Sequence, residues 1–218
     1  MGSTRSCRSY SNKNNKFFKL ILRDKTAILK FLLIGGFFYI IPLDTIAQQS
    51  NDAPYVIVLG TVQDGGSPHL GCNKNCCEAL TVFQKEARKV TALGVVEPKT
   101  DFNLLFEATP DIISQWKIFP STPKAIFITH AHMGHYTGLL QLGREALGAK
   151  NIPVHVMPRM AVFLKKNGPW SQLISLENIK LFPMAQNESV NFTSEIIITP
   201  LIVPHRDEFS ETVGYRIQ

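Results

Sequence analysis

Three histidines lie within six positions at the end of an apolar run, in "KAIFITHAHMGHYTGLL" (residues 124–140). His130 and His132 are two residues apart, so on an extended chain leaving a strand both side chains point to the same side. His135 follows three positions later, where a tight turn into a helix can bring it back toward the other two. Imidazole is the usual ligand of zinc and similar metals at neutral pH. The pattern therefore predicts a metal site. The alternative, ordinary loop histidines, is disfavoured by their clustering directly after a buried strand.

The elements around these histidines indicate how they are positioned. The apolar run 124–129 predicts a strand that delivers the chain into the histidine stretch. In α/β folds, ligand-binding loops lie at the carboxyl ends of such strands. Residues 55–60 predict a buried first strand followed by a glycine- and proline-containing loop, and residues 90–96 and 103–108 predict a hairpin.

Helical spacing of apolar residues predicts helices over 78–89 and 137–147. Asp111 is predicted to cap a third helix over 112–118. Strand-like runs close the chain. Because helices and strands alternate in the middle, with hairpins on either side, the sequence predicts a single layered α/β domain over residues 48–218.

The basic charge of the chain is confined to its amino-terminal part. The formal net charge is +6, and residues 1–47 hold eight Lys or Arg against two Asp, which accounts for the whole excess. The remaining residues hold 15 basic and 15 acidic side chains. The globular part therefore lacks the net positive charge expected of a nucleic-acid-binding protein.

The same amino-terminal part has the order of a secretory signal peptide. Basic residues precede an uninterrupted apolar run of 11 residues, Phe31–Ile41, which Pro42 ends, and Thr45-Ile46-Ala47 then places small residues at the first and third positions. This run is shorter than the ~20 residues that a membrane-spanning helix needs. We expect cleavage after Ala47 and an exported protein, periplasmic or secreted. The alternative is an uncleaved anchor, which would be the chain's only contact with a membrane.

The stretch "THAHMGH" resembles the H-x-H-x-D-H signature of the metallo-β-lactamase fold superfamily, whose members are αββα sandwiches that hold one or two metal ions, most often zinc. The segments "VLGTVQDGGSPHLGC", "LLFEATPD" and "VPHRDEFSETVGYRI" are similar to the branch that includes the pyrroloquinoline quinone biosynthesis protein B family. The resemblance covers about residues 55–218. It implies an αββα sandwich, and the last strand-like segment ends without a turn, which suggests a sandwich truncated at the carboxyl terminus.

The resemblance also implies a ligand set. His130 and His132 would hold a first metal ion together with His205, which ends another β run. His135 would bind a second ion, but the family's aspartate belongs at position 134, where this chain has Gly134. The implied cofactor is zinc, one or two ions, with iron or manganese as alternatives. Such a metal would lower the pKa of a bound water to ~7, so the implied function is a hydrolase that attacks a small-molecule substrate with metal-bound hydroxide.

Two other functions stay open. One is a role like that of the quinone-biosynthesis branch, in cofactor biosynthesis, transport or iron-dependent oxygenase chemistry. The other is a non-catalytic binding protein that retains the scaffold, which Gly134 favours. Asp64 and Asp207 are candidates for a catalytic carboxylate that orients the attacking water, although each is also explained as an ordinary loop residue. The sequence predicts no particular oligomeric state.

A second group of ligand-type residues follows the first predicted strand. His69, Cys72, Cys76 and Cys77 are arranged as H-x2-C-x3-C-C, a close spacing typical of structural zinc. The alternative, favoured in an exported protein, is a disulfide and buried thiols in place of a metal. The adjacent Cys76 and Cys77 would pair with each other only in strained geometry.

Overall fold

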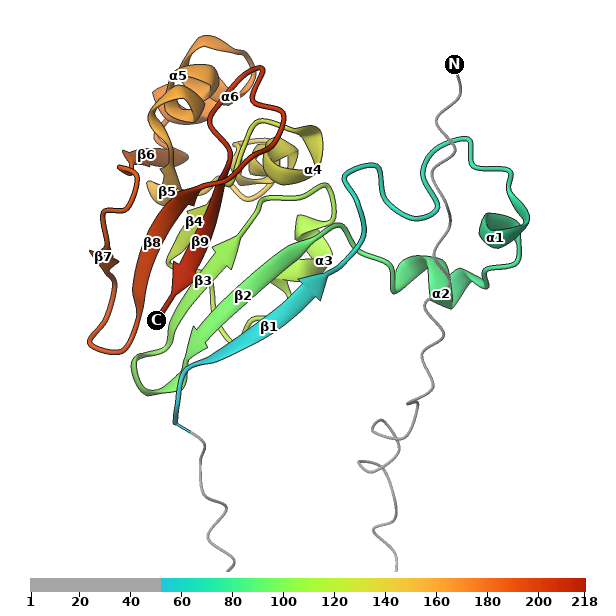
Figure 1. Cartoon of the computed structure of the whole chain (residues 1–218), viewed down its shortest axis with the longest axis horizontal. Helices are drawn as coiled ribbons and strands as arrows, with labels where there is room; N and C mark the ends of the chain where they lie inside the picture. Colours follow the sequence, from blue (N-terminus) through green and yellow to red (C-terminus); the bar gives the residue numbers. More distant parts are fainter. Residues whose placement is uncertain (1–51) are drawn as a thin grey trace, which may run out of the picture. The chain divides into compact units, whose positions relative to one another are not determined.

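Two β-sheets organise the part of the chain that the computed structural model describes, residues 52–218. The larger sheet has six strands in the order β1–β2–β3–β4–β5–β6, and the smaller has the order β7–β8–β9 (Figure 1). The predicted signal peptide or anchor, residues 1–47, lies outside the described residues. The strands are β1 (Tyr55–Gly60), β2 (Ala92–Glu97), β3 (Phe102–Phe106), β4 (Ala125–Phe127), β5 (Ile152–Val156), β6 (Ile179–Pro183), β7 (Val190–Asn191), β8 (Ile197–Ile202) and β9 (Val213–Ile217).

The larger sheet is mixed, and its parallel half leads to the histidines. Strands β1, β2 and β3 pair antiparallel, which confirms the predicted hairpin of β2 and β3. Strands β3 to β6 pair parallel, so their carboxyl ends share one edge of the sheet. Strand β4 is only three residues long, and all three are buried between parallel neighbours. A continuous apolar run is what a strand covered on both faces requires.

The helices of the described part are short. Where the sequence predicts an α-helix over 137–147, the structure has a 3-10 helix, Thr137–Leu142, followed by turns. The helical run ends at Gly143, whose backbone is extended. Within the run, the Gly138 N–H donates to the Ala108 carbonyl in a neighbouring loop. A Cβ at this position would lie 2.1 Å from the Thr109 carbonyl oxygen, so the chain packs too closely there for any larger residue. The α-helices are α1 (Asn75–Glu78), α2 (Val82–Glu86), α3 (Ile112–Trp116), α4 (Met133–Tyr136), α5 (Pro158–Lys166) and α6 (Trp170–Ser175).

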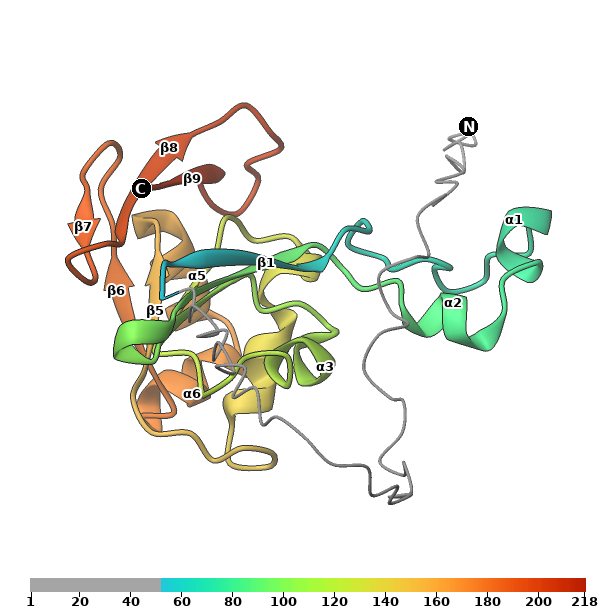
Figure 2. The same cartoon turned by 90° about the horizontal axis from the view of Figure 1, so that it is seen from below.

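The helix predicted over 78–89 is likewise replaced, by the two short helices α1 and α2. Thr81 separates them, because its backbone is extended and its side chain forms a capping box with Gln84 at the start of α2. This segment extends away from both sheets in the two views (Figures 1 and 2). The apolar side chains of α2 are accordingly exposed, Val82 at 71% and Phe83 at 79%.

Asp111 does not cap α3 with its side chain, which corrects the expectation from the sequence. Its Oδ2 instead accepts a hydrogen bond from the Val90 N–H at 2.8 Å, which ties α3 to the chain entering β2. The Asp111 N–H is itself bonded to Thr109 Oγ1 at 3.0 Å.

Two apolar cores lie on opposite faces of the larger sheet. Alternate strand residues point to each face, so Leu105 packs with the helices while Leu104 and Phe106 pack toward the smaller sheet. Figure 2 shows β7–β9 on one side of the larger sheet and α3 and α6 on the other. The prediction of a layered α/β domain is confirmed, and three layers are present in residues 52–218, where every element after β6 is a strand. None of the described helices is long and apolar enough to cross a membrane.

Candidate metal centre

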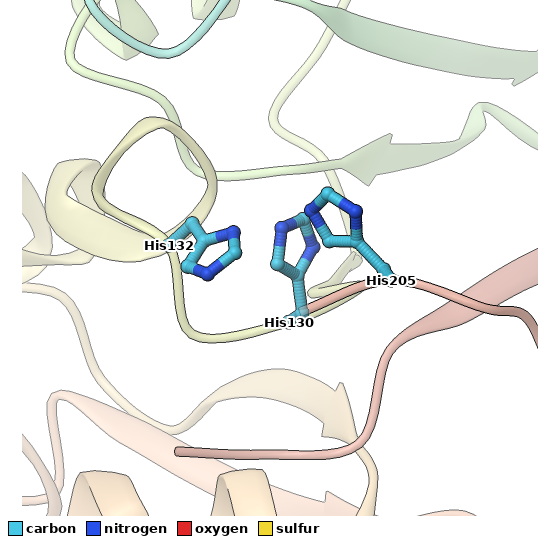
Figure 3. A group of neighbouring side chains, drawn as sticks. All are labelled: His130, His132 and His205. Carbon is cyan, nitrogen blue, oxygen red and sulfur yellow. The ribbon is translucent and has the colours of Figure 1, made fainter. Parts of the chain in front are cut away.

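Three imidazoles from two distant loops meet at one edge of the larger sheet. His130 and His132 follow β4, and His205 follows β8 (Figure 3). One ring nitrogen from each lies within 4.8 Å of the others. The ring centroid of His205 is 4.8 Å from that of His130 and 5.1 Å from that of His132. The structure therefore brings together the three residues that the resemblance assigns to a first metal ion.

Backbone and hydroxyl contacts hold the two loops against each other. The Ala131 N–H donates to Ser210 Oγ at 2.9 Å, and the Val213 N–H donates to the Thr129 carbonyl at 3.1 Å. The Tyr215 hydroxyl donates to the Ile128 carbonyl at 2.9 Å. Strand β9 thus fixes the exit of β4 beside the loop that carries His205.

His130 and His132 each have one ring nitrogen close to a neighbouring oxygen and one without a hydrogen-bond partner. Nδ1 of His130 lies 2.8 Å from Thr129 Oγ1, and Nε2 of His132 lies 3.2 Å from Glu208 Oε2. The opposite nitrogens, His130 Nε2 and His132 Nδ1, are buried and have no hydrogen-bond partner. A buried polar atom without a partner costs free energy. Metal-binding histidines characteristically bond one nitrogen to a neighbouring oxygen and present the other to the ion, so these donors fit a metal.

Electrostatics keep the central ring neutral. Burial, and then the neighbouring His135, His132 and His205, lower the pKa of His130 from 6.5 to about 3. A neutral imidazole is the form that binds a metal, so His130 is available as a ligand throughout the neutral range.

His135 adjoins the three-histidine cluster but has different partners. Its ring centroid is 4.1 Å from that of His130. Its Nε2 lies 3.1 Å from Asp64 Oδ1, and its Nδ1 lies 3.2 Å from Glu107 Oε1, an ion-pair distance without well-directed hydrogen-bond geometry. Burial alone would lower the pKa of His135, but the two carboxylates outweigh it and raise the pKa above its ordinary value.

Glu107 is a site residue that the sequence interpretation missed. It is 5% exposed, directly follows β3, and its Oε2 accepts a hydrogen bond from the Thr129 N–H at 3.2 Å. Its backbone adopts φ of 77°, which is uncommon for a residue with a side chain. The available signal was its place: a carboxylate immediately after a buried strand that runs parallel to the strand before the histidines.

The two predicted catalytic aspartates lie in different surroundings. Asp64, in the loop after β1, contacts His135 as described. Asp207 lies next to Arg159, whose guanidinium donates to the Asp207 carbonyl at 2.9 Å and is 3.7 Å from its carboxylate. Arg159 and Asp207 line a cavity of about 370 Å³ that opens beside His205. The lining residues are Arg159, Ile202, Val203, Pro204, His205, Asp207, Glu211 and Thr212.

The predicted structural zinc site on His69, Cys72, Cys76 and Cys77 is replaced by a covalent link. Cys72 and Cys77 form a disulfide, so their sulfur atoms are not thiolate ligands in this structure. The exposed His69 points a ring nitrogen to the Leu70 carbonyl oxygen, 2.9 Å away. The spacing pattern alone could not separate the two outcomes, because a disulfide and a zinc site both require cysteines close in space.

The layered α/β fold, with a histidine cluster at the carboxyl end of a central strand, is the arrangement expected of the metallo-β-lactamase class of proteins. Residues 102–218 match the Beta-lactamase superfamily domain, and the chain belongs to this family.

Among individual proteins, the chain is similar to Coenzyme PQQ synthesis protein B. The protein of Nitrosococcus oceani is 32% identical over 97 residues, which cover 39% of this chain and 31% of that protein. The protein of Methylorubrum extorquens (strain PA1) is 25% identical over 161 residues, which cover 69% and 52%. The chain thus spans from about a third to about half of the length of these curated relatives. The predicted likeness to this branch is confirmed.

Two solved structures share the fold. Zn(2+)-bound PqqB from Methylobacterium extorquens superposes with a TM-score of 0.59 at 22% identity, over 75% of this chain and 61% of that one. A diphosphatase from the PhnP family superposes with a TM-score of 0.57 at 21% identity, with the same coverage. The predicted metallo-β-lactamase fold is therefore confirmed.

Proposed function

We propose that this chain is a metal-dependent, hydrolase-like protein that holds a metal ion on His130, His132 and His205. The observation that carries the proposal is the pair of buried imidazole nitrogens that face the centre without a partner. Three imidazole nitrogens form a donor set typical of zinc sites that keep an open position for water or substrate. The solved structure of PqqB is a Zn(2+)-bound form, which supports the choice of zinc here, with iron or manganese as alternatives.

The surrounding residues suit a hydrolytic centre. A bound divalent ion supplies an acidified water and polarises an electrophilic oxygen of the substrate. Thr129 and Glu208 orient the rings that would hold the ion. The cavity beside His205 admits a small molecule, and Arg159 and Asp207 offer groups of opposite charge on its wall. We therefore propose a small-molecule substrate.

A second candidate function comes from the relatives. The similarity to Coenzyme PQQ synthesis protein B favours a role related to quinone-cofactor biosynthesis. The matched segments cover only part of those proteins, so this role is a proposal for the chain as a whole. A non-catalytic binding protein on the same scaffold is the third possibility, and metal content separates it from the first two.

Metal analysis of the purified chain tests the proposal. We expect at least one equivalent of zinc or iron per chain, lost in the His130→Ala/His132→Ala double variant because two of three ligands are removed. His155→Phe is the matched control, since it removes an imidazole that stacks on Phe127 away from the cluster. A folded wild-type chain that binds no metal would contradict the proposal and favour the binding protein. If metal is present, a chelator should abolish hydrolysis of a phosphodiester probe such as bis(p-nitrophenyl) phosphate.

We further propose that the protein is exported, as its amino-terminal sequence predicts. The Cys72–Cys77 disulfide supports this, because disulfides persist in oxidising compartments. Mass spectrometry of the protein from its native cells should find an amino terminus near residue 48 and no free thiol at either cysteine. An intact leader on a protein recovered from the cytosol would contradict export.

A further inference from the structure

The space where the family carries an aspartate is filled in this chain by a residue from another loop. A Cβ built on the buried Gly134 would lie 2.5 Å from the Cα of Asp64, 2.7 Å from its Cβ and 2.8 Å from its Cγ. Such separations are too short for non-bonded carbon atoms. Position 134 therefore has no room for a side chain while Asp64 occupies its place, and only glycine fits.

The Asp64 carboxylate reaches the neighbour of that position. Its Oδ1 lies 3.1 Å from Nε2 of His135. Two ligand atoms bound to one tetrahedral zinc at ~2.0–2.1 Å are separated by about 3.3 Å, so this distance suits a shared ion as well as a hydrogen bond. The other nitrogen of His135 faces the Glu107 carboxylate at 3.2 Å. A carboxylate on that side of the ring attracts the Nδ1 proton and so favours the tautomer whose Nε2 is open to a metal, although the contact is not a well-directed hydrogen bond.

We propose that Asp64 supplies, from the loop after β1, the carboxylate that position 134 lacks, and that Asp64 and His135 form the protein part of a second divalent-cation site. The 4.1 Å between the His135 and His130 ring centroids places this pair directly beside the three-histidine cluster. The proposal rests on the proposed function, since the second ion would adjoin the first.

This assignment explains two features with one cause. Gly134 lacks the aspartate of the motif, and the loop after β1 packs closely against it. Both features follow if Asp64 of that loop occupies the volume that a side chain at position 134 would fill. Asp64 and Asp207 would then have different roles. Asp64 would bind the second ion together with His135, whereas Asp207 lies at the cavity wall beside Arg159. The competing explanation is a hydrogen bond between Asp64 and His135 with no second ion.

Zinc titration of the full chain, followed by calorimetry and by metal analysis of the protein after gel filtration, separates these explanations. We expect two zinc ions per wild-type chain and one in Asp64→Asn, which keeps the shape of the side chain but replaces an anionic oxygen by an amide. Gly134→Ala should also bind one ion, because its methyl group would displace the Asp64 loop. Asp207→Asn is the matched control and should bind two. Circular dichroism checks that each variant is folded.

The number of bound zinc ions distinguishes failure of the second site from failure of the three-histidine site. One ion in the wild type, unchanged in Asp64→Asn, would overturn the second site and leave the three-histidine proposal intact. Two ions retained in Asp64→Asn or Gly134→Ala would also overturn it, because the second ion would then be held elsewhere. No ion in the wild type would overturn both proposals.

Discussion

Side chains near His130 show which features of the centre depend on local sequence. The H-x-H spacing after a strand was enough to predict that His130 and His132 share a side, because strand geometry fixes it. The partners of His135 could not be predicted in this way. Glu107 and Asp64 come from other elements, and their contacts depend on how β3 and the loop after β1 pack against α4.

Glu107 and His135 provide a test at this scale. In metal-free protein, Glu107→Gln should lower the pH at which His135 titrates, because the neighbouring carboxylate contributes to its raised pKa. The imidazole resonances in an NMR pH titration measure this directly. Glu211→Gln is the control, since Glu211 bonds to the Arg159 N–H rather than to a histidine of the cluster. An unchanged His135 midpoint in Glu107→Gln would show that the carboxylate does not act on this ring.

At the level of elements, the apolar runs of β1, β2, β3 and β4 are all strands, as predicted, and β2 pairs antiparallel with β3 as expected of a hairpin. The predicted burial of β1 is wrong: β1 is the edge strand of the larger sheet, and Tyr55, Val56 and Val58 are exposed. The helices were predicted less well. Apolar periodicity predicts helices in these regions, but it does not predict the break at Thr81, where a capping box starts α2, or the break at Gly143, where the backbone is extended.

Strand β5 carries a buried histidine, His155, which should make the stability of the fold depend on pH. His155 stacks on Phe127 and Phe182, with ring centroids 4.8 and 5.3 Å away, and burial lowers its pKa to about 4. Between pH 6.5 and 4 the unfolded chain therefore binds the proton that the folded chain excludes, and stability falls as the pH falls. From pH 7 to pH 5 this residue should account for about 2 kcal/mol of lost stability.

The contribution of His155 to this loss of stability can be measured by urea unfolding of the metal-free protein at pH 7 and pH 5. His155→Phe should reduce the acid-induced loss by about 2 kcal/mol. It should not abolish the loss, because the lowered pKa of His130 acts in the same direction and in an overlapping range. An identical loss in the variant and the wild type would mean that His155 is not held neutral by its aromatic neighbours.

Across residues 52–218, the fold brings the loop after β4 and the loop after β8 to the same edge of the larger sheet. The parallel strands β3, β4 and β5 end together, and β9 binds the exit of β4, so the loop after β8 meets the loop after β4. The alternation of helices and strands predicts the layered class, the spacing of His130 and His132 predicts a metal site, and the family resemblance adds His205 to it. The sequence could not predict the disulfide in place of zinc at Cys72 and Cys77, since both arrangements satisfy the same spacing.

We expect His130, His132 and His205 to bind one metal ion. Anomalous diffraction at the zinc edge, from crystals of the zinc-loaded protein, tests it most directly. We expect a peak ~2.0–2.1 Å from Nε2 of His130, from Nδ1 of His132 and from one ring nitrogen of His205. A zinc peak elsewhere with these three rings unliganded, or a His205 ring turned away from the other two, would contradict the claim.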